Sequence, residues 1–315
     1  VVMGVGVVEE AVGDAEAAVV TSDMDVSHPK TGYIPRSLLF QWHVTERCNL
    51  RCQHCYQDGI PSSELDFDSL LDILEQFKAL LANFRAHQPV PAHITLTGGE
   101  PFVRKDFPKL VELISSQPEL FSFAILTNGT FIDRAIASWL SCMKPAFIQV
   151  SLDGMQSTHD QIRGAGNFEQ TITSIRNLRA EKVPIAISFT AQRQNYREFL
   201  DVAQLGRELN VQLVWSDRVI PAGHNQKELE VQALSTTETR AWLDVMSQAH
   251  KDGKLDPSNC TEIGLNRALQ FWVGNNQPYR CSAGDSLISL LPNGDLVPCR
   301  RMPIVVGNVL EQPMT

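Results

Sequence analysis

The stretch Cys48-Asn49-Leu50-Arg51-Cys52-Gln53-His54-Cys55 places three thiols in one short loop, with the spacing CxxxCxxC. Iron–sulfur cubanes normally take four Cys ligands. A loop that supplies three can therefore hold a [4Fe-4S] cluster and leave one iron open to a small molecule. An open coordination position is typical of a metal centre that does chemistry, whereas structural centres are closed.

Other metal sites fit this loop less well. Structural zinc requires four ligands, usually as two separated pairs, and His54 lies between Cys52 and Cys55, where it is poorly placed to complete a tetrahedron. A bacterial ferredoxin run requires a further Cys followed by Pro, and the residues after Cys55 provide neither. A chance cluster of cysteines is the remaining alternative.

Composition excludes several functional classes. The chain has 315 residues, of which 43% are hydrophobic and 20% charged, as in an ordinary globular protein with one large and one smaller domain. The formal net charge of -9 argues against a general nucleic-acid surface, which requires basic patches. No apolar run approaches the roughly 18 residues of a membrane span. We therefore expect no nucleic-acid partner and no membrane span.

The cysteine content indicates the compartment. Residues 1–8 are apolar but lack the basic residues of a signal peptide, so we expect no secretion. Seven Cys in a chain without a secretion signal favour metal or redox chemistry over disulfides. The sequence therefore predicts a reduced, cytoplasmic protein.

From residue 38 onward, short β-like runs alternate with helical patterns. The predicted strands are 39–44, 93–97, 123–126, 147–151, 184–190 and 211–215, and the predicted helices are 66–84, 107–116, 133–140, 168–180 and 196–209. Repeated strand–helix units of this size indicate a parallel sheet with right-handed crossovers. Six such units can form a partial barrel, in which function sits at the carboxyl ends of the strands.

Polar and glycine-rich motifs follow three of these strands. Residues 97–101 read Thr-Gly-Gly-Glu-Pro, in which paired glycines let a ligand approach the backbone and the carboxylate can hold an ammonium group. The next strands end in Thr-Asn-Gly at 127–129 and Ser-Leu-Asp-Gly at 151–154, with Arg163 soon after. A Ser hydroxyl and an Arg guanidinium together suit a carboxylate. Each motif alone fits an ordinary turn, a capping Ser or a solvated Arg, but their recurrence at successive strand ends favours a binding site.

The Cys loop and these strand-end motifs together resemble the radical S-adenosylmethionine (radical SAM) superfamily, over roughly residues 38–223. The resemblance implies an α/β fold with a partial (β/α)6 TIM-like barrel. It also implies one-electron reduction of S-adenosylmethionine (SAM) to methionine and a 5′-deoxyadenosyl radical that abstracts hydrogen from a substrate. The electron would come from a donor such as flavodoxin or ferredoxin.

The resemblance assigns roles to individual residues. Cys48, Cys52 and Cys55 are expected to hold the [4Fe-4S] cluster, whose open iron takes the amino and carboxylate groups of SAM. The residues expected to bind SAM share a position in the Cys loop or just after a strand: His54, Tyr56, Gly98, Gly99, Glu100, Asn128, Ser151, Asp153 and Arg163. Among them, Gly98, Gly99 and Glu100 are assigned to the amino group, Ser151 and Arg163 to the carboxylate or ribose, and His54 to the side of the adenine.

A second cysteine pair lies near the end of the chain. Cys281 and Cys299 flank an Asn293-Gly294 turn, which predicts a hairpin between residues 287–291 and 296–297. This arrangement resembles the start of the SPASM or twitch extensions of radical SAM enzymes, where two such Cys begin an auxiliary iron–sulfur cluster. Two Cys cannot hold a cubane alone. We expect that the chain stops before the remaining ligands; loss of the auxiliary site, or a structural hairpin with free Cys, are the alternatives.

The sequence divides into four expected parts: a poorly structured segment at 1–37, the radical SAM core at 38–223, a helical linker at 224–279 and a partial SPASM/twitch extension at 280–315. Several conspicuous side chains have plain structural interpretations. We expect packing roles for Trp215, Trp242 and Trp272, a local ion pair for Asp217 in preference to acid/base catalysis, solvated helix-start positions for His159 and Asp160, and burial for Cys142. Cys260 and the catalytic acid or base stay unassigned.

The leading hypothesis is a radical SAM enzyme that modifies a peptide or protein, as ribosomal-peptide maturases and sulfatase maturases do. Oxidation of a tetrapyrrole or another small molecule is the alternative substrate class. An iron–sulfur electron-transfer protein is the alternative of another class; it would explain the Cys loop but not the Gly-Gly-Glu and Ser/Arg strand ends.

Overall fold

The computed structural model describes residues 34–55, 57, 64–221, 226–255, 260–264, 281–302 and 304–314. Its strands form one sheet in the order β10-β9-β8-β1-β2-β3-β4-β5-β6-β7. Their bounds are β1 Leu38–His43, β2 Ala92–Thr97, β3 Ser122–Thr127, β4 Phe147–Ser151, β5 Ile185–Ala191, β6 Leu213–Arg218, β7 Glu262–Gly264, β8 Leu287–Leu290, β9 Asp295–Val297 and β10 Gly307–Asn308.

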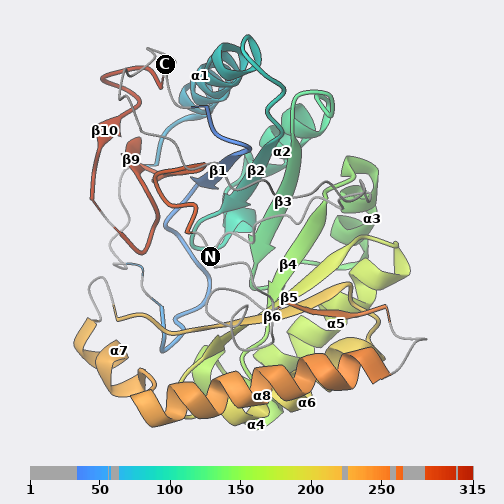
Figure 1. Ribbon diagram of the computed structural model, residues 1–315. Coiled ribbons are helices and arrows are strands. Elements are labelled where there is room, and N and C mark those ends of the chain that lie inside the picture. The colour runs from blue at the N-terminus through green and yellow to red at the C-terminus, as the bar shows by residue number, and fades with distance from the viewer. Residues whose placement is uncertain are drawn as a thin grey trace, which may run out of the picture.

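Helices form an outer layer on this sheet (Figure 1). They are α1 Phe67–Arg85, α2 Phe107–Ser115, α3 Arg134–Met143, α4 Gln156–Arg163, α5 Asn167–Ala180, α6 Phe199–Glu208, α7 Gln226–Gln232 and α8 Thr236–Leu255, with 3-10 turns η1 Pro101–Val103 and η2 Tyr196–Glu198. Within the described ranges, no helix combines the length and apolar character that crossing a bilayer requires.

The first seven strands run parallel, and each crossover from β1 to β6 carries at least one helix. All six residues of β1 and of β2 are buried, including the polar side chains that alternate with apolar ones along β2. Phe40 of β1 stacks on Phe77 of α1 with ring centroids 4.6 Å apart. The predicted α/β fold with a parallel sheet is confirmed.

The six predicted strands and the helices between them are present within a few residues of their expected bounds. Helix α1 shows why its start was predictable: the Asp66 carboxylate accepts a hydrogen bond from the Ser69 N–H at 2.9 Å, a side-chain N-cap. The elements that escaped prediction include β7, α4, η1 and β10. The strand β7 extends the sheet beyond β6. Helix α4 forms in the segment after β4, whose sequence is polar.

The predicted hairpin near the end of the chain is confirmed and lies in the main sheet. Strand β8 pairs antiparallel with β9, and also parallel with β1, with Leu39 opposite Leu287. The same segment contacts α1, because the Gln76 side chain donates to the Val309 carbonyl at 3.1 Å and accepts from the Met314 N–H at 3.1 Å. The extension is therefore joined to the strand that leads into the Cys loop.

Several expectations fall wholly or partly outside the described residues. They concern most of the 1–37 segment, Tyr56, Trp272 and the boundaries proposed near residues 223 and 279. Trp215 and Trp242 are both 3% exposed, which confirms the packing role of Trp242; Trp215 is equally buried but also lines the pocket described below.

Two expectations were wrong. His159 was expected to be solvated at a helix start, but it is fully buried, where its Nδ1 accepts from the Asp153 N–H at 3.1 Å and its Nε2 lies 2.8 Å from Asn167 Oδ1. The reason is that α4 lies against the loop after β4 and against α5, where Phe168 meets the His159 ring edge-on. Asp160 is half-buried and caps the next helix by accepting from the Phe168 N–H at 2.7 Å. Cys142 was expected to be buried but is exposed on α3.

The Gly98–Gly99 pair holds the loop after β2 against the backbone that enters the Cys loop. The Gly99 N–H donates to the Thr45 carbonyl at 2.8 Å, and the Glu100 N–H donates to the Arg47 carbonyl at 2.9 Å. A Cβ on Gly98 would lie 2.4 Å from Thr45 O, and one on Gly99 would lie 2.2 Å from Arg47 O. These glycines are needed because two backbone segments of the protein itself approach closely.

Two buried histidines on adjacent strands stay neutral. Burial lowers the pKa of His93, on β2, to about 4, and lowers the pKa of His43, at the end of β1, to about 3, with a further contribution from the Arg300 charge. His93 Nδ1 lies 2.8 Å from Ser122 Oγ, while its Nε2 has no partner within the described residues. Protonation of either ring would therefore bury a poorly compensated charge.

Replacement of Gly99 should destabilise the fold. Because the added methyl group meets backbone atoms that cannot rotate away, we expect Gly99→Ala to lower the free energy of unfolding by about 1–3 kcal/mol. Gly253→Ala is a matched control: its Cβ meets Ile263 at an ordinary 3.6 Å inside α8, and helix propensity should raise stability by up to about 1 kcal/mol. Urea unfolding of both variants measures the difference; equal effects would contradict the close-packing argument.

The buried imidazoles predict loss of stability on acidification. Their folded pKa values lie below the unfolded value near 6.5, so only the unfolded state takes up protons as the pH falls from about 6.5 towards 4. His93→Gln should flatten this dependence by up to about 1.4 kcal/mol per pH unit, whereas replacement of the exposed His87 should not. Urea midpoints at pH 7, 6 and 5 provide the test, and parallel profiles for wild type and His93→Gln would refute it.

Candidate active site

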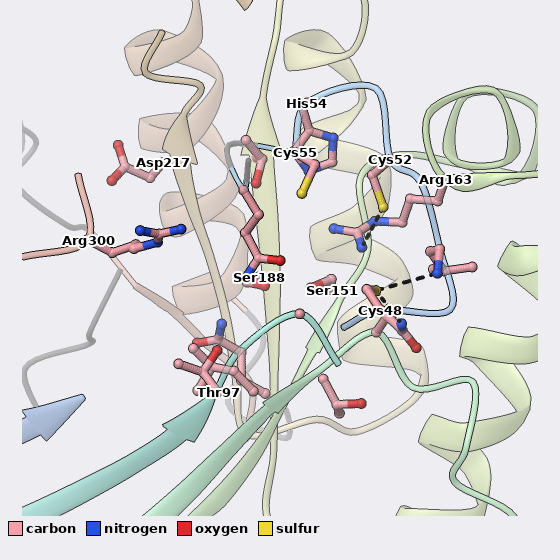
Figure 2. A pocket seen from close by; sticks show the side chains of 18 of the residues that line it. Cys48, Cys52, His54, Cys55, Thr97, Ser151, Arg163, Ser188, Asp217 and Arg300 are labelled. Atoms are coloured by element: carbon pink, nitrogen blue, oxygen red, sulfur yellow. Dashed lines mark hydrogen bonds between the residues drawn. The ribbon is translucent and has the colours of Figure 1, made fainter. Parts of the chain in front are cut away.

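One pocket opens at the carboxyl ends of the central strands. It is lined from the Cys loop by Cys48, Leu50, Cys52, His54, Cys55 and Gln57; from the strand ends by Thr97, Gly98, Gly99, Leu126, Thr127, Asn128, Gln149, Ser151, Ser188, Phe189, Thr190, Trp215, Asp217, Val219 and Ile220; from the end of α4 by Arg163; and from the extension by Arg300 and Arg301. The three cysteines and Arg163 lie on one side, and Asp217 and Arg300 on the other, with Ser151 and Ser188 between them (Figure 2).

The thiols of the Cys loop receive hydrogen-bond donors from several elements. The Leu50 N–H lies 3.4 Å from Cys48 Sγ, the Asn128 amide 3.8 Å from the same sulfur, and the Arg163 guanidinium 3.7 Å from Cys52 Sγ. Burial raises the pKa of the Cys52 thiol to about 11. The Arg163 charge acts in the opposite direction, because a nearby cation stabilises the thiolate. Coordination to a metal removes a thiol proton outright, and N–H donors to sulfur are typical of iron–sulfur sites.

A buried ion pair orients Arg163. Its Nε donates to Asp153 Oδ2 at 2.6 Å, while Asp153 Oδ1 accepts from the Thr190 N–H at 2.8 Å. Burial is the largest single influence on the pKa of Asp153 and raises it, but the Arg163 charge, the two neighbouring histidines and the Thr190 N–H together outweigh burial, and the pKa lies below its usual value. His54 Nε2 is 3.4 Å from the same carboxylate; burial lowers the pKa of His54 to about 4, so the ring is neutral.

Glu100 connects the ends of β2 and β3 beneath the pocket. Its carboxylate is completely buried and accepts from the Thr127 hydroxyl at 2.8 Å and from the Asn128 N–H at 2.7 Å. Burial raises the pKa of Glu100 to about 7, and these hydrogen bonds act in the opposite direction. Because the Thr-Asn-Gly turn depends on them, Glu100 places Asn128 at the pocket wall.

The structure brings most of the expected site residues together. The three cysteines, His54, Gly98, Gly99, Asn128, Ser151 and Arg163 all line the pocket. Glu100 and Asp153 lie behind its wall, where each accepts hydrogen bonds from neighbouring strand ends. Tyr56 is outside the described residues.

Sequence reasoning missed the part of the wall formed by β4, β5 and β6. Ser188 and Thr190 alternate on β5 as half-buried side chains that line the pocket, and Gln149 accepts from the Trp215 indole N–H at 3.2 Å. The period of two in polar residues at the carboxyl end of a buried strand was the available signal. Nothing in the sequence indicated that Arg300 and Arg301 reach the same pocket.

The extension provides the far wall. Asp217, at the end of β6, accepts from Arg301 Nη1 at 2.8 Å. The expected ion pair is therefore present, but it is not local, because its partner lies 84 residues away in the chain. Cys299, just before this pair of arginines, is half-buried, and Cys281 is exposed. Their role as auxiliary ligands stays a prediction.

The residues of the Cys-loop wall fit the expected cofactors. Within the described residues, no three His, Cys, Asp or Glu side chains surround one point as a mononuclear metal ion would require. A cubane presents a separate iron to each cysteine, so its ligands need not meet at one point. Three thiols, a guanidinium, a Ser hydroxyl and an amide on one wall provide a donor set for an iron–sulfur cluster and for the amino and carboxylate groups of a zwitterion.

Two known proteins are similar to long stretches of this chain. Fe-coproporphyrin III synthase of Methanosarcina barkeri (strain Fusaro / DSM 804) is 32% identical over 65% of this chain and 49% of its own length, so the chain spans about half of that relative. Sporulation killing factor maturation protein SkfB of Bacillus subtilis (strain 168) is 27% identical over 92% of this chain and 66% of its own length.

The fold is shared with a solved structure, that of Streptococcus suis SuiB bound to S-adenosylmethionine. The TM-score is 0.69 at 15% sequence identity, over 90% of this chain and 65% of that one. The profile of the Radical SAM superfamily matches residues 42–206, which is more than half of the chain. This range runs from the end of β1 into α6 and includes the Cys loop and the ends of β2 to β5. The chain belongs to the radical SAM superfamily.

Proposed function

We propose that this protein is a radical SAM enzyme in which Cys48, Cys52 and Cys55 hold a [4Fe-4S] cluster and SAM binds beside it. The observation that carries the proposal is the convergence of these thiols with Arg163, Ser151 and the Gly98–Gly99 backbone on one pocket. When bound, the cluster and SAM supply a 5′-deoxyadenosyl radical that abstracts hydrogen from a substrate. The electron donor, expected to be flavodoxin or ferredoxin, and the cytoplasmic setting belong to the same proposal.

The roles of this chain's own residues follow from their contacts. Arg163, fixed by Asp153, is oriented to meet a carboxylate beside Cys52, and Ser151 at the end of β4 can donate to the same group. Asn128, placed by Glu100, donates to Cys48 and lies at the opposite end of the loop. His54 stays neutral, so its ring can pack beside a base without adding charge.

Two substrate classes have support among the relatives. Modification of a peptide or protein, the class inferred from the sequence motifs, has SkfB, a maturation protein, as a relative over most of the chain. Tetrapyrrole chemistry has Fe-coproporphyrin III synthase, at higher identity over a shorter stretch. The SPASM or twitch character of the extension, with Cys281 and Cys299 as the first ligands of an auxiliary cluster, is part of the same proposal.

Removal of one cluster ligand should abolish SAM cleavage. We expect anaerobically reconstituted protein with dithionite to convert SAM to 5′-deoxyadenosine and methionine, and Cys55→Ala to give only the background amount. Cys142→Ala, which removes an exposed thiol outside the pocket, is the matched control. Product formation is quantified by liquid chromatography. Retained activity in Cys55→Ala would refute the ligand assignment, and an electron-transfer protein would hold iron without cleaving SAM.

Arg163 should contribute to SAM binding through its geometry as well as its charge. Lysine cannot contact Asp153, Cys52 and a ligand carboxylate with one planar group, so Arg163→Lys should weaken SAM binding about 10-fold. Arg176→Lys, on the exposed face of α5, should leave the dissociation constant unchanged. Equilibrium dialysis with labelled SAM distinguishes these outcomes; equal affinities in wild type and Arg163→Lys would remove Arg163 from the site.

A further inference from the structure

The wall of the pocket opposite the Cys loop carries two adjacent arginines. Arg300 and Arg301 follow Cys299 in the extension, and their side chains are only 11% and 20% exposed. Both line the pocket, and Arg300 lies across it from Cys48 and Cys52 (Figure 2). Guanidinium groups buried this far are normally placed to meet anionic groups.

The side chains that line the pocket include more guanidiniums than carboxylates. In the part of the chain that the structure describes, the lining has three guanidiniums, Arg163, Arg300 and Arg301, and a single carboxylate, Asp217. Arg163 is held by Asp153 from behind the wall, so it belongs to the side of the Cys loop. The far side therefore presents two guanidiniums, of which Arg301 pairs with Asp217 in the lining and Arg300 pairs with Glu46 from outside it.

The contacts of the two arginines hold them in place for a ligand. Arg301 donates to Asp217 through Nη1 at 2.8 Å, and a guanidinium has five N–H donors, so this bond orients the group and leaves donors for a further partner. Arg300 Nη2 lies 3.6 Å from Glu46 Oε1, which is a longer separation than that of the Arg301 pair. Burial, followed by the Arg300 charge, lowers the pKa of nearby His43, so no second cation forms behind Arg300 near neutral pH.

We propose that Arg300 and Arg301 bind a carboxylate group of the substrate. The proposal rests on the radical SAM function proposed above and adds the chemical class of the molecule that occupies the far side of the pocket. A planar carboxylate matches the donor fork of a guanidinium and can bridge two of them. Bound there, it directs the remainder of the substrate past Ser188 and Ser151 towards the Cys loop.

Such a carboxylate has two chemical sources, the propionate side chains of a tetrapyrrole or the acidic side chains of a peptide. The test therefore uses two matched probe pairs: coproporphyrin III and its tetra-amide, and a glutamate-rich peptide and its glutamine counterpart. Dissociation constants are measured by isothermal titration calorimetry on the anaerobically reconstituted full chain with SAM present.

The acidic member of one pair should bind about 10-fold or more tightly than its neutral counterpart, as charge-assisted hydrogen bonds predict. Arg300→Gln and Arg301→Gln should each remove most of this preference, and Arg301→Lys should restore part of it. Arg218→Gln is the matched control, because Arg218 is the next residue after Asp217 on β6 but its side chain faces a different depression, with Leu234 and Leu243. It should keep the wild-type preference and the wild-type SAM cleavage.

Loss of Arg301 leaves Asp217 without this ion pair, so the double variant Asp217→Asn/Arg301→Gln removes both charges if the single variant does not fold. The proposal is overturned if wild-type protein prefers neither acidic probe, or if the preference survives in Arg300→Gln and in the Arg301 variants. The pair that shows the preference identifies the source of the carboxylate. Absence of 5′-deoxyadenosine from wild-type protein would overturn the proposed function while leaving an arginine-dependent carboxylate preference intact.

Discussion

The buried ion pair between Asp153 and Arg163 is the interaction on which the site depends. One carboxylate oxygen accepts from Arg163 at the end of α4, and the other accepts from the backbone of Thr190 on β5. Arg163 in turn reaches Cys52, and Asp153 lies near His54. The Cys loop, the end of β4, α4 and β5 are therefore connected through two side chains, although they are far apart in sequence.

The value of this pair lies in position more than in net stability. Taking both charges out of water costs several kcal/mol per ion, which their attraction only roughly repays, whereas removal of one partner typically costs about 3–5 kcal/mol. Such a pair adds little net stability to the fold, but breaking it is costly. Its main effect is therefore to fix the positions of the two side chains. Glu100 serves β2 and β3 in the same way, with a completely buried carboxylate that accepts from Thr127 and Asn128. Two buried acids thus arrange the strand ends, and neither lines the pocket.

How much could be predicted from the sequence depended on the range of the interactions. Local patterns were sufficient for the strands, for the helix predicted at 66–84 and for the thiols, Ser151 and Arg163 that line the pocket. Helix α4 and the burial of His159 were not predictable, because a polar segment becomes buried only through contacts with the loop after β4 and with α5. Arg300 and Arg301 gave no local signal either, since their position depends on the pairing of β8 with β1, between residues about 250 positions apart.

That pairing also determines the order in which the sheet can be completed. Strand β1 lies between β2 and β8, and Gln41 on β1 accepts a hydrogen bond from Ser289 across 248 residues of chain. Until residues 287–290 have been synthesised, one edge of β1 has no neighbour, and its sequence Leu-Leu-Phe-Gln-Trp-His is strongly apolar. Open apolar edges are where strands of different molecules pair. Among the described strands, β1 comes first in the chain, yet one of its edges is covered only when β8 has been made, which leaves the growing protein open to aggregation at the strand that leads into the Cys loop.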